Sequence, residues 1–217
     1  MSEITSPTEL SKNTTIGVVG LGYVGLPLAI EFGKKYQTTG FDISSKRIQV
    51  LKSGTDSTGE VDPTQMAESE TLFYTDDISN LEGSDIFIVS VPTPIDSNNR
   101  PDLTAIKTAS EAFWEIVDKG ATIIFESTVF PGATEENCVH IIEKTSRMTL
   151  NKDFFVGYSP ERINPGDKAH SLKNVIKVTS GSTTETLNFV DALYQSIVCL
   201  LYTSPSPRDA TLSRMPS

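Results

Sequence analysis

Short apolar runs rich in β-branched residues alternate with longer segments of helical period from residue 14 onward. This rhythm is typical of parallel strands joined by crossover helices. Most of the runs are apolar almost throughout, so helices must cover both faces of the sheet. The sequence therefore predicts an α/β fold with a doubly wound parallel sheet. The predicted strands are Thr15–Val19, Gln37–Phe41, Thr71–Thr75, Ile86–Val91, Thr122–Glu126, Phe154–Gly157 and Val175–Thr179, and the predicted helices are Leu26–Lys35, Ser44–Ser53, Pro63–Glu70, Leu103–Asp118, Thr134–Arg147 and Thr183–Ile197.

The first predicted strand runs directly into a glycine-rich turn, GLGYVG at residues 20–25, and then into a predicted helix. Gly20 permits a tight turn, Gly22 lets the backbone approach a pyrophosphate, and Gly25 allows close helix packing. Free N–H groups at the start of the helix attract the anion. Pro27 fits the first helical turn, where its missing donor is not needed. Such a turn in this context predicts a Rossmann-like dinucleotide site.

A carboxylate follows at the end of the second predicted strand. Asp42 lies twenty residues beyond Gly22, where it can accept hydrogen bonds from both hydroxyls of an adenosine ribose. A negative charge there would repel a 2′-phosphate, so the sequence favours NAD over NADP. Arg47 is a candidate contact to the adenine side. The alternatives are a helix-capping role for Asp42 and a solvated helix face for Arg47.

Proline-bearing loops follow three of the predicted strands, at the sheet edge where ligands bind in open α/β folds. Because prolines stiffen these loops, the hydroxyls of Thr93, Ser127 and Thr128 would be presented from a braced backbone. The alternative is that the prolines only terminate strands. The loops are Val91–Pro94, Glu126–Gly132 and Tyr158–Asp167.

The third loop places Glu161, Arg162 and Asn164 between two prolines, with Asp167 shortly after the second proline. Donors and acceptors of this kind suit a sugar diphosphate, and a carboxylate among them can act as a general base or orient water. A structural Arg–Glu ion pair is the alternative interpretation.

Composition excludes several classes of partner. The formal charge is −10, and no run of Lys or Arg exceeds two residues, which argues against nucleic acid and anionic membranes. The sequence contains no apolar run of membrane-spanning length and no apolar signal core near its start, so we expect a cytoplasmic protein. Cys138 and Cys199 lack a partner motif, and His140 and His170 lack a ligand pattern, so we expect no metal site.

The ends of the chain differ from its middle. Residues 1–13 are polar, and we expect a flexible leader there. Residues 14–198 are expected to form the NAD-binding domain. Residues 200–217 contain three prolines and four serines without helical or strand period, so we expect residues 199–217 to be a disordered, artefactual tail.

Taken together, four motifs resemble the UDP-glucose/GDP-mannose dehydrogenase family. They are GLGYVGLP (20–27), VPTP (91–94), ESTVFPG (126–132) and YSPERINPGD (158–167). The last motif, with SGS at 180–182, is similar to the UDP-N-acetylglucosamine and UDP-N-acetylgalactosamine 6-dehydrogenases of bacterial surface polysaccharide biosynthesis, including the Vi-antigen type. The resemblance extends from about Thr15 to Val198.

The resemblance implies NAD-dependent oxidation of the sugar C6 hydroxyl to a carboxylate, through an aldehyde and a thioester on cysteine. Thr128 and Glu161 would serve the acid/base and water-handling steps, and Glu161, Arg162 and Asn164 would bind the UDP-N-acetylhexosamine. The NAD contacts would be Gly20, Leu21, Gly22, Tyr23, Val24, Gly25, Asp42, Arg47, Val91, Pro92, Thr93, Pro94, Ile95, Ser127, Thr128 and Val129.

The sequence departs from the family in one respect. Family members carry a nucleophilic cysteine, a lysine and an asparagine further along the chain, and no residue here matches them. We therefore expect a fragment that is inactive alone. The family's homodimer contact would come from the same missing region. A β-hydroxyacid-type NAD dehydrogenase and a non-catalytic dinucleotide-binding module remain alternatives.

Overall fold

The computed structural model describes residues 6–7, 9–94, 102–112, 115–127, 138–160, 176–198 and 200–203. Its strands are β1 (Thr15–Val19), β2 (Gln37–Phe41), β3 (Leu72–Thr75), β4 (Ile86–Val89), β5 (Thr122–Phe125), β6 (Phe155–Tyr158), β7 (Ile176–Gly181) and β8 (Leu200–Thr203). Its helices are α1 (Gly25–Gly33), α2 (Ser45–Lys52), α3 (Pro63–Ala67), the 3₁₀ turn η1 (Ile78–Leu81), α4 (Thr104–Ala112), α5 (His140–Ser146) and α6 (Thr184–Gln195).

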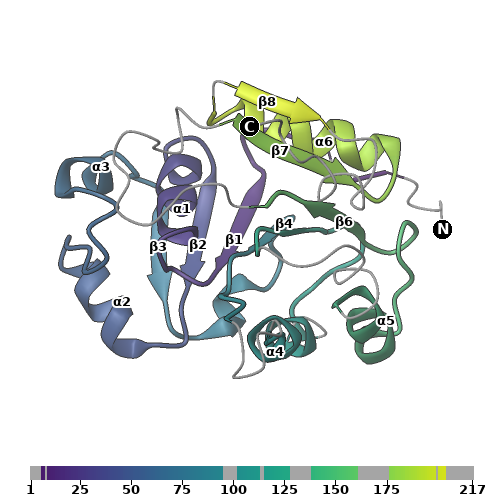
Figure 1. Ribbon diagram of the computed structural model, residues 1–217, viewed down its shortest axis with the longest axis horizontal. Helices are drawn as coiled ribbons and strands as arrows, with labels where there is room; N and C mark the ends of the chain where they lie inside the picture. The colour runs from purple at the N-terminus through teal and green to yellow at the C-terminus, as the bar shows by residue number, and fades with distance from the viewer. Residues whose placement is uncertain are drawn as a thin grey trace.

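The strands form one sheet in the order β3-β2-β1-β4-β5-β6-β7-β8 (Figure 1). Strands β1 to β6 pair in parallel. The chain order reverses between β1 and β4, which is the topological switch point where such sheets bind ligands. The predicted doubly wound, Rossmann-like fold is confirmed, and β1 and β2 have the predicted bounds.

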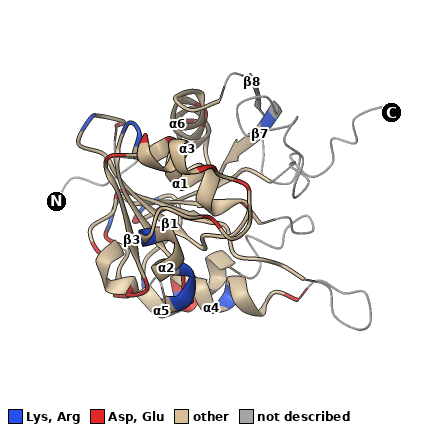
Figure 2. Cartoon of the chain, turned by 90° about the vertical axis from the view of Figure 1, so that its left-hand side faces the viewer, with Lys and Arg blue, Asp and Glu red and all other residues tan. Residues whose placement is uncertain are grey.

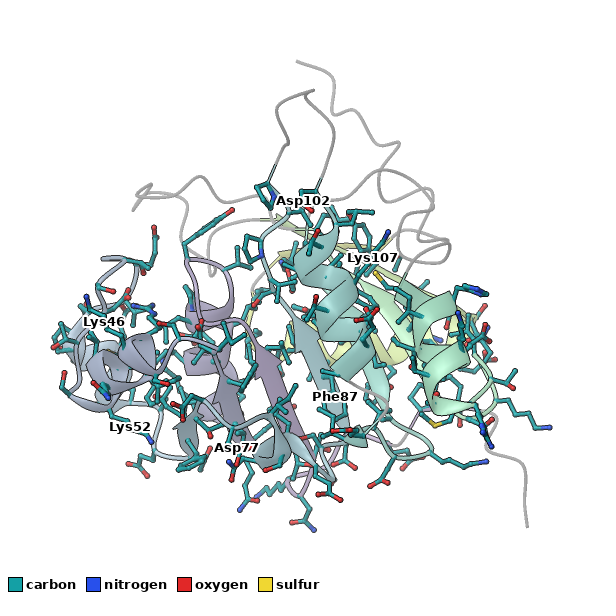
Figure 3. All side chains as sticks on the ribbon, turned by 90° about the horizontal axis from the view of Figure 1, so that it is seen from below. Lys46, Lys52, Asp77, Phe87, Asp102 and Lys107 are labelled. Atoms are coloured by element: carbon teal, nitrogen blue, oxygen red, sulfur yellow. The ribbon has the colours of Figure 1, made fainter. Side chains whose placement is uncertain are left out.

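Two apolar cores lie on opposite faces of the sheet. One contains buried residues of α1, α2 and α6, among them Phe32, Ile48 and Tyr194. The other contains buried residues of α4 and α5, among them Ile106 and Ile142. Figure 3 shows α4 crossing its face of the sheet, with Asp102 and Lys107 at its beginning. Both faces of the strands are therefore covered, as their apolar composition requires.

The far end of the sheet differs from the prediction in two ways. Strand β7 runs antiparallel to β6, although a wholly parallel sheet was predicted. The sequence between these strands has no clear helical period, so it does not predict the crossover helix that usually joins parallel strands. Strand β8 pairs in parallel with β7, so the prediction of a disordered tail is wrong for Leu200–Thr203. Cys199 and residues 204–217 lie outside the described residues, as do residues 1–5 and 8 of the predicted leader.

Acidic and basic positions are interspersed along the elements (Figure 2). Within the described ranges, no helix is both long and apolar enough to cross a membrane.

Candidate functional site

The glycine turn after β1 has the backbone geometry that its sequence predicts. Gly20 has φ +91°, a value that residues with a Cβ atom rarely adopt. Its N–H donates to the carbonyl of Phe41 at 2.8 Å, which ties the turn to the end of β2. The turn therefore bends sharply at the switch point of the sheet.

The other two glycines have opposite environments. A Cβ atom at Gly22 would meet nothing within 4 Å, and Gly22 lines the cavity described below. At Gly25 it would lie 1.8 Å from the carbonyl oxygen of Gly20 and 2.2 Å from Oγ of Ser90. That hydroxyl donates to the same carbonyl at 2.7 Å. Gly22 thus leaves room for a ligand, whereas Gly25 lets helix α1 touch the turn and the end of β4.

The start of α1 presents unused main-chain donors. Its N-cap, Val24, makes no capping hydrogen bond with its side chain. The first helical bond runs from the N–H of Leu26 to the carbonyl of Gly22 at 3.1 Å. Within the described part of the chain, the N–H groups of residues 22–25 have no acceptor. Free amides at the positive end of a helix dipole form a binding site for an anion.

Asp42 connects the glycine turn to the beginning of α2. One carboxylate oxygen accepts from the N–H of Leu21 and the other from the N–H of Ser44, both at 2.9 Å. Ser44 itself caps α2 by accepting from the N–H of Arg47. A carboxylate has about four lone-pair sites, so Asp42 retains acceptor capacity towards the cavity that it lines.

Arg47 braces the turn from behind. Its Nε donates to the carbonyl of Leu21 at 2.9 Å, Nη1 donates to Oγ of Ser57 at 2.9 Å, and Nη2 lies 2.7 Å from a carboxylate oxygen of Asp56. Arg47 does not line the cavity. The described structure therefore shows it supporting the backbone of the turn.

Asp56 is a residue that sequence reasoning missed; it lies in a Gly/Ser/Thr-rich stretch between α2 and α3 that contains no recognisable motif. Burial alone would raise the pKa of Asp56, but hydrogen bonds from Thr58, Arg47 and Val61 together hold it below its usual value. The loop thus contributes a stable anion that pairs with Arg47.

A cavity of about 1320 Å³ opens at the carboxyl edge of the strands. Four residues of the glycine turn, Asp42 and the loop after β4 line it, so the structure brings these predicted site residues together, whereas Leu21 and Gly25 do not line the cavity. Sequence reasoning missed its wall on α4, although alanines and a threonine at helical spacing mark a face that a ligand can approach closely. The lining residues are Val19, Gly20, Gly22, Tyr23, Val24, Phe41, Asp42, Ile43, Asp76, Asp77, Ile78, Ser90, Val91, Pro92, Thr93, Pro94, Ala105, Thr108, Ala109, Ala112, Glu126 and Ser127.

The predicted loop residues are described in part. The hydroxyl of Ser127 donates to the carbonyl of Val91 at 2.6 Å, which joins the loops after β4 and β5. Thr93 lines the cavity with its neighbouring prolines. Six predicted site residues lie outside the described residues: Ile95, Thr128, Val129, Glu161, Arg162 and Asn164.

The remaining nucleophile and ligand candidates have ordinary surroundings. Cys138 is buried among apolar side chains and His140 is exposed. Among the described residues, His, Cys, Asp and Glu side chains form no group of three that could hold a metal ion.

Comparison with known proteins agrees with this geometry. Residues 14–198 match the family model described as "UDP-glucose/GDP-mannose dehydrogenase family, NAD binding domain". The chain is 54% identical over 187 residues to the UDP-N-acetyl-D-glucosamine 6-dehydrogenase of Pseudomonas aeruginosa, a match covering 86% of this chain and 44% of that protein. It is 49% identical over 183 residues to the protein of the same name from Salmonella typhi, covering 84% and 43% of the two chains.

One solved structure of a dehydrogenase is also similar to this chain. The UDP-D-ManNAc dehydrogenase of Pyrococcus horikoshii superposes with a TM-score of 0.84 at 32% identity, covering 92% of this chain and 48% of that one. The chain spans less than half the length of each of these three relatives.

Proposed function

Since the chain belongs to the UDP-glucose/GDP-mannose dehydrogenase family and contains its NAD-binding domain, we propose that it is the cofactor-binding part of a UDP-N-acetylhexosamine 6-dehydrogenase. The whole enzyme would oxidise the C6 hydroxyl of the sugar to a carboxylate. NAD supplies the hydride acceptor for that oxidation. The relatives named UDP-N-acetyl-D-glucosamine 6-dehydrogenase support this substrate class.

The glycine turn carries the proposal. The unpaired N–H groups of residues 22–25 would hold the pyrophosphate, and the open space at Gly22 would admit it. Asp42 would accept hydrogen bonds from the adenosine ribose with its remaining lone pairs. Its negative charge disfavours the 2′-phosphate of NADP. The other predicted NAD contacts are Val91, Pro92, Thr93, Pro94, Ile95, Ser127, Thr128 and Val129.

The substrate side of the proposal rests on the loop after β6. Glu161, Arg162 and Asn164 would bind the UDP-sugar, and Thr128 with Glu161 would handle protons and water. Ser159, directly before that loop, is buried at the carboxyl edge beside the end of β5. The loop therefore starts next to the strand whose own end lines the cavity.

Titration calorimetry with NAD and NADP tests the cofactor site. We expect NAD to bind and NADP to bind more weakly. Asp42→Ala should weaken NAD by about 1–3 kcal/mol, the range for losing hydrogen bonds to a charged group. Asp62→Ala is the matched control, because the Asp62 carboxylate also accepts a backbone hydrogen bond, as the N-cap of α3, but lies outside the cavity. Equal NAD affinity in wild type and Asp42→Ala would remove Asp42 from the site.

Substrate class is tested in a chain as long as the relatives. Reduction of NAD with UDP-N-acetylglucosamine or UDP-N-acetylgalactosamine is the expected result, with small β-hydroxyacids inert. The opposite preference would favour the β-hydroxyacid dehydrogenase alternative, and inertness towards both would favour a non-catalytic dinucleotide-binding module.

A further inference from the structure

A buried charged cluster lies at the carboxyl ends of β5 and β6. Glu126, Ser159, Lys177 and Tyr194 are each 0% exposed, and we call them the Lys177 cluster. The ammonium of Lys177 donates to one carboxylate oxygen of Glu126, and the hydroxyl of Tyr194 donates to the other. Lys177 also reaches the carbonyl of Ser159 at 3.4 Å and lies 5.7 Å from the ring centre of Tyr194.

The cluster joins the starting points of two loops. Glu126 directly follows β5 and Ser159 directly follows β6, and the strand residues before them, Phe125 and Tyr158, are register partners. The loop after Glu126 begins with Ser127, which lines the cavity. The loop after Ser159 is the one proposed above to bind the UDP-sugar. One ammonium group therefore contacts the residue that precedes each loop.

The same contacts continue to a third loop. Glu126 lines the cavity, and the next residue, Ser127, bonds to the carbonyl of Val91. Val91 belongs to the loop after β4, which also lines the cavity. A continuous path of contacts thus runs from β7 to the cavity, although no described residue of β7 or α6 lines it.

The charge of Lys177 makes this path rigid. Two ionised groups that are both excluded from water must stay paired and hydrogen-bonded, because an unpaired buried charge is strongly unfavourable. Any movement that separates the ends of β5 and β6 must stretch the contacts of Lys177 to Glu126 or Ser159. The ion pair therefore fixes the position of the ends of β5 and β6 relative to each other. This positioning is its main effect, and its net contribution to the free energy of unfolding is secondary.

We propose that Lys177 is a positioning residue that holds the ends of β5 and β6, and with them the first residues of the cofactor loop and of the sugar-nucleotide loop, in one fixed relation. The assignment of ligands to these loops rests on the proposed function. The link between the ends of β5 and β6 rests only on the contacts of the Lys177 cluster.

Amide hydrogen exchange tests the link without any ligand. The N–H of Glu126 donates to Val89 and the N–H of Ser159 donates to Phe125, both at 2.9 Å, so each amide reports on one strand end. In Lys177→Met we expect both amides to exchange at least roughly tenfold faster, while amides at the glycine turn stay protected. Lys119→Met is the control, because Lys119 pairs with Asp153 just before β5, at the opposite end of that strand.

The paired variant Glu126→Gln/Lys177→Met separates placement from stability. Neither partner is left as an unpaired charge, so its unfolding midpoint should return close to that of wild type. We expect fast exchange at the two strand ends to persist, together with NAD affinity roughly tenfold below wild type. A merely structural role predicts that stability, exchange and affinity recover together, and that result would overturn the proposal. This variant also decides the matter if Lys177→Met does not fold.

The two proposals can fail separately. Absence of NAD binding by wild type would contradict the proposed function, while the exchange experiment would still decide the role of Lys177. Slow exchange at both strand ends in the paired variant, with NAD bound normally by wild type, would overturn the role of Lys177 and leave the proposed function intact.

Discussion

The glycine turn and the Lys177 cluster hold the same sheet edge by different means. The turn is built mainly from residues close in sequence, and its parts are backbone amides, glycines and one carboxylate. The Lys177 cluster joins Glu126 to partners 51 and 68 residues away, and its parts are buried side chains. The comparison teaches that this sheet edge has a local half, the glycine turn, which the sequence shows as a motif, and a long-range half, the Lys177 cluster, which only the folded chain reveals.

Glu126→Ala should cause the largest loss of stability, because it removes the carboxylate at the centre of the Lys177 cluster. Lys177 and Tyr194 would both lose the buried carboxylate to which they donate, and the expected loss of unfolding free energy is about 3–5 kcal/mol. Urea denaturation measures this loss. A loss below about 1 kcal/mol would mean that the pair matters little to the fold.

Within the local half, Gly25→Ala should be severe and Gly22→Ala mild. The new methyl group at residue 25 would overlap the carbonyl oxygen of Gly20, so we expect a loss of about 3 kcal/mol in unfolding free energy. At residue 22 the methyl group meets open space, and stability should change by less than about 0.5 kcal/mol.

NAD titration completes the comparison of the two glycines. We expect Gly22→Ala to weaken NAD at least tenfold, about 1.4 kcal/mol, because its methyl group occupies the space proposed for the pyrophosphate. Equal stability of the two variants would contradict the different roles assigned to these glycines.

Asp56→Asn tests whether the ion pair between Asp56 and Arg47 helps to stabilise the local half. Loss of the charged bonds to Arg47 should cost about 1.5 kcal/mol at neutral pH. The pKa of Asp56 is lowered in the folded state, so its contribution is present above the ordinary value of 3.8 and is lost as pH falls through the folded pKa. Stability curves of wild type and variant should therefore converge in acid, and parallel curves would contradict this assignment.

Tyr74→Phe should have the smallest effect. The Tyr74 hydroxyl is buried without a hydrogen-bond partner in the described structure, so its removal should be neutral or stabilising by up to about 1 kcal/mol. Burial raises the pKa of Tyr74 to about 12. Above pH 10 the unfolded chain ionises first, so wild-type stability should fall with pH. Urea titrations at pH 9 and 11 should show a smaller fall for the variant.

Local patterns predicted the local half well. The strand–glycine–helix motif located β1, α1 and the separate roles of Gly20, Gly22 and Gly25, because each depends on a few neighbouring residues. The spacing also indicated that Asp42 lies beside the glycine turn, and the structure places it there. The sequence offered the cavity wall on α4 only as small residues at helical spacing, a signal that is equally typical of a buried helix face.

The long-range half could not be read in this way. A lysine in a short strand such as residues 176–181 looks like an ordinary strand residue until its partner on another strand is known. The direction of β7 and the existence of β8 depend on pairing choices that apolar period alone does not encode. Asp56 was missed because the sequence does not show that the loop after α2 folds back and brings Asp56 next to Arg47.

Tyr194 has a consequence for how motion passes through the molecule. Its ring packs edge-on against Phe32 of α1, with centres 5.9 Å apart, while its hydroxyl bonds to Glu126 at the end of β5. One rigid aromatic side chain thus bridges the helix that begins at the glycine turn and the strand end beside the cavity. A displacement of α6 would therefore reach the helix behind the glycine turn and the cavity-side end of β5 at the same time.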